Sequence, residues 1–219
     1  MNNIKTRIKN QGLIDETHAR IARAAVSLFI KKGFHQTSIR EIADASRMSM
    51  GLLYRYISSK DDVLSLAYEQ IHKENLEGIS SAKMEKSRNP REKLKKSMEN
   101  MLKLVERDRK KYLFVYTESK FLSPNALKPV LEKENIVIEH FRKIIEEGIK
   151  SGQFDIQHAP LAASIISYIL MIGPLRGWSF RKKYPPDFSI RYLINFCLRA
   201  ISRGDGNKKS RRRKSKAEP

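Results

Sequence analysis

Residues 37–64 read TSIREIADASRMSMGLLYRYISSKDDVL, and the order of hydroxyl, acidic and apolar side chains in this stretch predicts how the chain folds. Ser38 and Glu41 have the spacing of a capping box, in which a hydroxyl and a carboxylate satisfy the first free N–H groups of a helix, and Thr37 is an alternative cap. The apolar positions that follow recur three to four residues apart and form one stripe: Ile39, Ile42 and Ala43. The stretch therefore predicts a short helix that begins near Ser38 and packs on one side.

A second helix is expected directly after the first. The pattern breaks at Ser46 and Arg47 and restarts at Ser49, whose hydroxyl can cap a helix over residues 50–57. The inner stripe of this helix is apolar: Leu52, Leu53, Tyr56 and Ile57. The outer face is left to four other residues: Ser49, Met50, Tyr54 and Arg55. Two short helices joined by a tight turn are the layout of a helix-turn-helix DNA-binding motif.

Two further features of this stretch suit a phosphate. Gly51 lies at the start of the second helix, where the missing side chain lets the backbone approach either the first helix or a phosphate closely. Ser59 and Asp62 repeat the capping-box spacing and predict a third helix. Lys60 then lies in the first turn of that helix, which is unfavourable for a cation unless an anion is near. A DNA phosphate would be that anion.

The segment from Asp15 to Glu74 resembles the DNA-binding domain of the TetR family of bacterial transcriptional regulators. Short motifs in the family's order carry the resemblance: Ala24-Ala25, Leu28-Phe29, Lys32-Gly33-Phe34, residues 37–43 (TSIREIA), residues 49–56 (SMGLLYRY) and residues 59–64 (SKDDVL). Two positions depart from the family's pattern, because Arg47 stands where glycine is common and Ile57 where phenylalanine is common. The resemblance implies a DNA-contact set: Thr37, Ser38, Arg47, Ser49, Met50, Gly51, Tyr54, Arg55 and Lys60.

The charge of the chain agrees with a polyanionic partner. The net charge is +20 over 219 residues, and positive charge is densest at the two ends. Residues 1–60 hold 11 Lys or Arg against 4 Asp or Glu, and residues 203–219 hold 8 against 2. The last segment lacks apolar periodicity and is predicted to be a disordered basic tail. Two interpretations of the tail stay open, a nonspecific clamp on DNA and a solubilising tail without a role.

Beyond residue 64 the pattern stays helical to about residue 203, without the alternating runs of strands. Pro174 is expected to kink a helix over 159–181, and the last helix is expected over 188–201. The predicted fold class is all-α, with about nine helices. Four segments follow: a basic N-terminal arm (1–14), a TetR-type helix-turn-helix domain (15–75), a C-terminal effector-binding and dimerisation domain (76–202) and the basic tail (203–219).

The helices over 159–181 and 188–201 are the expected homodimer surface. Each carries a wide apolar stripe. The stripe of the first consists of Ala162, Ile165, Ile166, Ile169, Leu170 and Ile172. The stripe of the second consists of Ile190, Leu193, Ile194, Cys197, Leu198 and Ile201. The alternative is that both stripes face the core of one subunit. The resemblance implies the dimer, whose two-fold symmetry would match a palindromic operator.

Resemblance to the family also implies a small-molecule pocket among the C-terminal helices. Ten residues are candidates to line it: Met98, Met101, Leu102, Phe114, Tyr116, Phe121, Phe141, Tyr168, Arg176 and Trp178. Methionine and aromatic side chains favour a hydrophobic effector, and fatty acyl-coenzyme A is the specific candidate that the family suggests. The alternative is that these side chains only pack the core.

Catalysis and metal binding are not expected. The five histidines are scattered without metal-ligand spacing, no glycine-rich phosphate loop follows a strand, and Asp61-Asp62 fits the first turn of a helix. No cofactor, membrane contact or secretion is predicted, and the single cysteine, Cys197, suits a reducing cytoplasm. The predicted function is a ligand-responsive repressor that binds its operator as a dimer and is released by its effector. The alternative is an architectural DNA-binding protein without an effector.

Overall fold

The computed structural model describes residues 4, 6–79 and 88–202, without the side chains of 74–79. Within these residues the chain forms ten α-helices, two 3-10 turns and an isolated antiparallel β-bridge between Phe154 and Ser202. The all-α prediction is therefore confirmed. The whole basic tail predicted over 203–219 lies outside the described residues.

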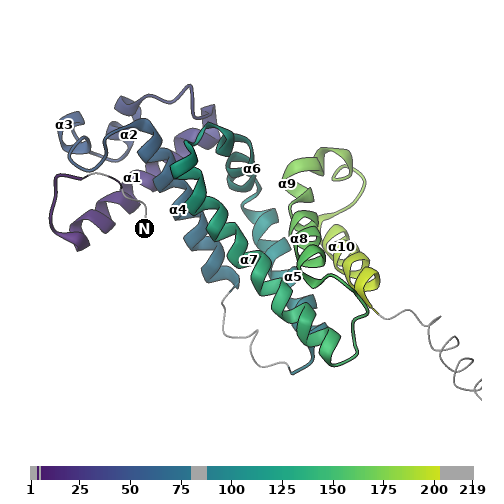
Figure 1. Ribbon diagram of the computed structural model, residues 1–219. Helices are drawn as coiled ribbons and strands as arrows, with labels where there is room; N and C mark the ends of the chain where they lie inside the picture. Colours follow the sequence, from purple (N-terminus) through teal and green to yellow (C-terminus); the bar gives the residue numbers. More distant parts are fainter. Residues whose placement is uncertain (1–3, 5, 80–87, 203–219) are drawn as a thin grey trace, which may run out of the picture. The chain divides into compact units, whose positions relative to one another are not determined.

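The described helices belong to two compact units, which we call unit 1 and unit 2. Unit 1 comprises Met1–Gly78 and Arg107–Asn135, and unit 2 comprises Ile79–Glu106 and Ile136–Pro219. Unit 1 contains α1 (Gln11–Lys32), α2 (Ile39–Ala45), α3 (Met50–Leu53), α4 (Lys60–Ile79), α6 (Arg109–Glu118), η1 (Ser119–Phe121) and the start of α7 (Pro124–Lys150) (Figure 1). Unit 2 contains α5 (Pro90–Arg107), the rest of α7, α8 (Ala159–Leu170), α9 (Ile172–Arg176), η2 (Gly177–Ser179) and α10 (Pro186–Ile201).

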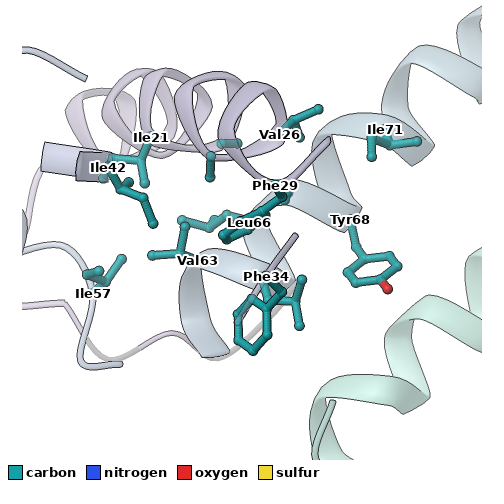
Figure 2. Packing of buried hydrophobic residues seen from close by; sticks show 14 of the residues in the cluster. Ile21, Val26, Phe29, Phe34, Ile42, Ile57, Val63, Leu66, Tyr68 and Ile71 are labelled. Atoms are coloured by element: carbon teal, nitrogen blue, oxygen red, sulfur yellow. The ribbon is translucent and has the colours of Figure 1, made fainter. Parts of the chain in front are cut away.

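The core of unit 1 is built from side chains of α1, α2 and α4 that converge between the helices, as Figure 2 shows. Phe114 of α6 completes this core, because its ring stacks on Phe29 at 5.6 Å and on Tyr68 at 5.8 Å between centroids. The Tyr68 hydroxyl donates a 2.9 Å hydrogen bond to the carbonyl of Val115. The unit that holds the predicted DNA reader is therefore larger than residues 15–75, since α6 fills part of its core.

The first helix begins earlier than expected. The Asn10 side chain accepts a 3.1 Å hydrogen bond from the N–H of Leu13, so α1 starts at Gln11 and the N-terminal arm ends at Asn10 instead of residue 14. At the other end Gly33 takes a φ of 85° and donates its N–H to Phe29, which ends the helix.

Unit 2 buries the inner apolar faces of its helices. On α5 these side chains are Leu94, Met98, Met101, Leu102 and Val105, and on α10 they are Ile190, Ile194, Cys197, Leu198 and Ile201. Gly148 of α7 is needed for this packing, because a Cβ there would lie 2.0 Å from the ring of Phe154.

The helix predicted over 159–181 with a kink at Pro174 is two helices instead. Pro174 has no N–H to donate to the carbonyl of Leu170, so α8 ends at Leu170 and α9 begins at Ile172. The two segments are bent by 48°. After α9, Arg181 packs across Gly177, where a Cβ would lie 2.7 Å from Nε, and its guanidinium donates a 2.7 Å bond to Glu106.

Candidate nucleic-acid interface

The start of α2 is fixed as the capping box predicted. The Ser38 hydroxyl accepts a 3.2 Å hydrogen bond from the N–H of Glu41, whose carboxylate accepts a 2.8 Å bond from the N–H of Ser38. Lys32 of α1 donates to the same carboxylate, and this bond, with those from Ser38, lowers the pKa of Glu41 to about 2. Both α1 and the local cap therefore hold α2 in place.

A tight turn follows α2. The Ser46 hydroxyl donates a 2.7 Å bond to the carbonyl of Ile42, and the N–H of Met48 donates a 2.9 Å bond to the carbonyl of Ala43. Arg47 takes a φ of 55°, in the left-handed region that strains residues other than glycine, and its side chain is exposed. Met48 is buried, which the sequence pattern did not predict.

The second helix of the motif is shorter than predicted. Ser49 caps it as expected, with a 3.2 Å bond from the N–H of Leu52 to the Ser49 hydroxyl, but α3 ends at Leu53 instead of residue 57. After Leu53 the chain forms a tighter turn, in which the N–H groups of Arg55 and Tyr56 donate to the carbonyls three residues earlier. The helix cannot extend further, because the N–H groups of Ser58 and Ser59 donate to the Asp62 carboxylate at 2.7 and 3.0 Å and cap α4 instead.

The surface of α3 and the turn after it is polar and open. Leu53, Tyr56 and Ile57 are buried and anchor it. The exposed side chains are Ser49, Leu52, Tyr54 and Arg55. A Cβ on Gly51 would meet no atom within 4 Å, so this glycine is not needed for packing against α2. Met50, a predicted base contact, is half-buried against the core, and Leu52 is 36% exposed although it was predicted to face inward.

Two of the predicted phosphate contacts, Thr37 and Lys60, interact with other residues of the protein. Thr37 is buried and its hydroxyl donates a 2.9 Å bond to the carbonyl of Gly33, so it supports the start of α2, and its role as a DNA contact stays a prediction. Lys60 lies 4.4 Å above the ring of Phe34 and donates a 3.2 Å bond to the carbonyl of His35. Burial lowers the pKa of Lys60, but its three N–H donors leave capacity for a phosphate as well.

The sequence pattern missed a hollow beside α3. Its volume is about 470 Å³, and it is lined by Thr6, Arg7, Tyr54, Ile57 and Ser58. Thr6 and Arg7 come from the N-terminal arm. The arm therefore lies next to the C-terminal end of the helix-turn-helix motif.

Two family models match the chain. Residues 21–67 match the bacterial regulatory proteins of the tetR family, and residues 87–171 match the tetracyclin repressor-like C-terminal domain. The chain belongs to the TetR family. The first match spans the helix-turn-helix motif just described, and the second spans most of α5 to α8.

Relatives of this TetR-family chain are similar over part or most of its length. The HTH-type transcriptional regulator HbdR of Aromatoleum sp. (strain CIB) is 33% identical over 84 residues, which are 35% of this chain and 37% of HbdR. The match therefore spans little more than a third of that protein. A bacterial regulatory protein in the tetR family from Rhodococcus RHA1 is 25% identical, with a TM-score of 0.74 over 87% of this chain and 99% of its own. AibR, solved in complex with isovaleryl coenzyme A and operator DNA, shares the fold at 18% identity, with a TM-score of 0.65 over 85% and 98% of the two chains.

The residues predicted to line a ligand pocket divide between the two units. In unit 1, Phe114 belongs to the core, whereas Tyr116 and Phe121 are exposed. In unit 2 four are buried, namely Met98, Met101, Leu102 and Phe141, and three are exposed, namely Tyr168, Arg176 and Trp178. Leu102 lines a cavity of about 30 Å³. Phe114 therefore packs the core of unit 1, the exposed residues do not line an interior cavity of their unit, and the role of all of them as ligand contacts stays a prediction.

Most of the residues named on the predicted dimer helices are buried within unit 2, so their role in a dimer contact stays a prediction. Ala162, Ile166 and Leu170 of α8 are buried in unit 2, as are all the named α10 residues except Leu193. The exposed stripe is a different set, which we call the outer face: Leu161, Ile165, Tyr168, Phe188, Tyr192 and Phe196. It adjoins a hollow of about 620 Å³ lined by α8, α10 and residues 155–158, and a second of about 360 Å³ lined by α10, Ile172, Phe180 and Tyr184.

Neither a metal centre nor a membrane span is evident in the described part of the chain. Within it, no group of three His, Cys, Asp or Glu side chains is placed to hold a metal ion. No single helix there is long and apolar enough to cross a bilayer, although the bent pair formed by Ala159–Leu170 and Ile172–Ser179 passes a test of length and composition together.

Proposed function

We propose that this TetR-family chain regulates transcription by binding an inverted-repeat operator as a dimer. One observation carries the proposal: α3 buries Leu53 beneath it while Ser49, Gly51, Tyr54 and Arg55 stay exposed on a surface without a carboxylate. Short polar side chains, a glycine and an arginine are what a helix needs to approach the phosphates and base edges of a major groove.

The contacts fall into two groups in this proposal. Arg47 and Lys60 neutralise phosphates at the edge of the motif. The Ser38 hydroxyl, which donates a 2.8 Å bond to the Glu41 carboxylate in the free protein, turns to a phosphate when DNA is bound. Ser49 and Tyr54 approach base edges, and Arg55 lies beside them, while the half-buried Met50 contributes only its exposed part. Gly51 lets the backbone at the start of α3 approach the DNA closely.

Dimerisation is assigned to the outer face of α8 and α10. Six large apolar side chains are exposed there, and such a face on an isolated subunit calls for an apolar partner. A second copy supplies one by two-fold symmetry. Two copies of α3 would then read half-sites about one turn of DNA, roughly 34 to 36 Å, apart.

The effector proposal is a hydrophobic ligand, with fatty acyl-coenzyme A as the candidate. It would enter among the buried Met98, Met101, Leu102 and Phe141 of unit 2, since methionine side chains rearrange readily around apolar ligands. AibR, which shares the fold, was solved with a coenzyme A thioester. Ligand binding would then reduce operator affinity, as for a repressor, and operator binding would reduce ligand affinity by the same factor.

Two glycine variants test the proposed DNA surface. The wild-type protein first selects a binding site from a pool of random duplex DNA, and the affinity of each variant for that site is then measured by titration. Gly51 and Gly12 both occupy the second position of a helix, both are exposed, and neither has a neighbour that excludes a Cβ. Alanine should not destabilise either helix, since it is favoured by up to about 1 kcal/mol over glycine. We expect Gly51→Ala to weaken DNA binding at least about tenfold, or about 1.4 kcal/mol, and Gly12→Ala to leave it unchanged. Full affinity in Gly51→Ala would contradict the placement of α3 against DNA.

The same titrations separate a repressor from an architectural protein. Selection of an inverted repeat, with loss of binding when long-chain acyl-coenzyme A is added, supports a ligand-responsive repressor. Selection of the repeat without an acyl-coenzyme A effect removes that effector. Recovery of no preferred sequence supports the architectural alternative.

A further inference from the structure

The N-terminal arm, residues 4–10, has two different sides. Ile4 and Ile8 are partly buried against the core of unit 1, whereas Arg7 and Lys9 are exposed. Thr6 lies half-buried between the two isoleucines. Alternation of this kind is typical of extended backbone, in which successive side chains point to opposite sides. Among its described residues, the arm therefore keeps Ile4 and Ile8 on the protein and Arg7 and Lys9 in solvent.

Hydrogen bonds fix the arm to the end of the helix-turn-helix motif. The N–H of Arg7 and the hydroxyl of Thr6 both donate to the carbonyl of Arg55, at 2.9 and 3.0 Å. The Thr6 hydroxyl also accepts a 3.2 Å bond from the N–H of Ile8. Arg55 itself belongs to the exposed surface that follows α3. The arm is thus attached to an element that the proposed function places on DNA.

The chemistry of the hollow beside this attachment suits an anion. Its polar side chains are those of Thr6, Arg7, Tyr54 and Ser58, and no carboxylate lines it among the described residues. The Arg7 guanidinium and the Tyr54 hydroxyl are groups that bind phosphate, whereas the Thr6 hydroxyl already donates to the carbonyl of Arg55. Lys9 follows two residues later on the same exposed side of the arm.

We propose that the arm is a second DNA-contact element, in which Arg7 and Lys9 bind backbone phosphates beside those contacted by the α3 surface. The proposal rests on the proposed function, because it needs DNA against α3. Thr6 is a positioning residue: it carries no charge, but its two hydrogen bonds hold Arg7 at the Arg55 carbonyl. The arm lengthens the footprint of each subunit without reading bases.

Salt dependence tests this proposal. Each phosphate contact contributes about 0.9 to the slope of log affinity against log salt concentration. Arg7→Ala with Lys9→Ala should therefore reduce the slope on the selected site by about 1.8 and weaken binding at least about tenfold at 0.1 M salt. The control is Lys95→Ala with Lys96→Ala, which removes two exposed cations of α5 in unit 2 and should change neither quantity.

Thr6→Val separates positioning from charge. It removes both hydrogen bonds of the hydroxyl and leaves every cation in place, so a smaller slope in this variant supports an ordered arm. An unchanged slope in Arg7→Ala with Lys9→Ala, with the wild type still binding its site, overturns the arm proposal alone. Failure of the wild type to bind DNA overturns the proposed function and this proposal together. A changed preference for base pairs flanking the site would overturn the phosphate assignment.

Discussion

The α3 surface of unit 1 and the outer face of unit 2 differ in chemistry. In unit 1 the surface around α3 consists of hydroxyl, glycine and arginine positions, with Leu52 as its one large aliphatic side chain that is exposed. In unit 2 the outer face of α8 and α10 presents six large apolar side chains. Both surfaces lie over tightly packed apolar interiors. The interior therefore holds each unit together, and the difference between the outer surfaces indicates a polyanionic partner for one and an apolar partner for the other.

The strongest test of this comparison places charge on the outer face. Tyr192→Glu with Phe196→Glu puts two carboxylates on α10, where both side chains are more than half exposed (61% and 54%). If a second copy covers them, burial of two unpaired charges should weaken dimerisation by at least about 1000-fold, or about 4 kcal/mol. Sedimentation velocity should then show a monomer with a native circular-dichroism spectrum.

A matched control uses exposed apolar residues of unit 1. Leu113→Glu with Leu131→Glu alters side chains that are 41% and 57% exposed, and this variant should remain dimeric. Persistence of the dimer in the α10 variant would show that the outer face of unit 2 is not the interface.

Core truncations should be costly in both units. Phe29 of unit 1 and Phe141 of unit 2 are 2% and 1% exposed, and replacement of either by alanine should lower the free energy of unfolding by about 3 to 5 kcal/mol. Denaturant unfolding followed by circular dichroism measures the loss. Tyr54→Ala, on the exposed surface beside α3, should change it by less than about 0.5 kcal/mol. A small effect at Phe141 alone would mean that unit 2 is loosely packed.

Local signals explain what could be predicted. The caps at Ser38, Ser49 and Ser59 involve partners three residues away, so the sequence is sufficient to place them. The resemblance to the family places a glycine where Arg47 stands, and the φ of 55° there is one that favours glycine. The start of the α2–turn–α3 motif was therefore predicted to within a residue, and so was most of its exposed surface.

Contacts between residues distant in the sequence explain what could not be predicted. Phe114 was a candidate pocket residue, and its ring stacks on Phe29 of α1 in the core of unit 1. On α10, apolar residues lie on both sides of the helix, so periodicity does not reveal whether Ile194 or Tyr192 faces the core. The structure shows Ile194 buried and Tyr192 exposed, because only one side of the helix packs within its own unit.

A histidine in each unit shows a further difference between the two interiors. His72 of unit 1 is 2% exposed, and its Nε2 makes no hydrogen bond among the described residues, although Glu134 Oε1 lies 3.6 Å away; Nε2 of His140 in unit 2 lies 3.1 Å from the Ser97 hydroxyl. Burial, with a smaller contribution from Lys133, lowers the pKa of His72 to about 4 from its usual 6.5. The unfolded chain therefore binds a proton at His72 between pH 6.5 and 4 that the folded chain does not.

Stability should accordingly fall as the pH decreases through this window. Stability from His72 is fully present above pH 6.5, and about 2 kcal/mol of it should be lost between pH 7.5 and 5. Urea unfolding of the wild type and His72→Leu at both pH values measures the difference, and the variant should lack this part of the pH dependence. Equal pH dependence in the two proteins would mean that His72 is protonated in the folded state.

The smallest expected effect concerns the turn between α2 and α3. Arg47→Gly removes the strain of a φ of 55° and should raise the free energy of unfolding by up to about 1 kcal/mol, although the greater freedom of glycine in the unfolded chain reduces the gain. The same change removes a proposed phosphate contact, so DNA affinity should fall while stability rises. Arg47→Lys keeps both the charge and the strain, and should leave stability and affinity close to wild type. Thermal unfolding and DNA titration of the two variants distinguish the effect of backbone strain on stability from the effect of the charge on DNA affinity. A loss of stability in Arg47→Gly would show that the arginine side chain stabilises this turn by more than its strained conformation costs.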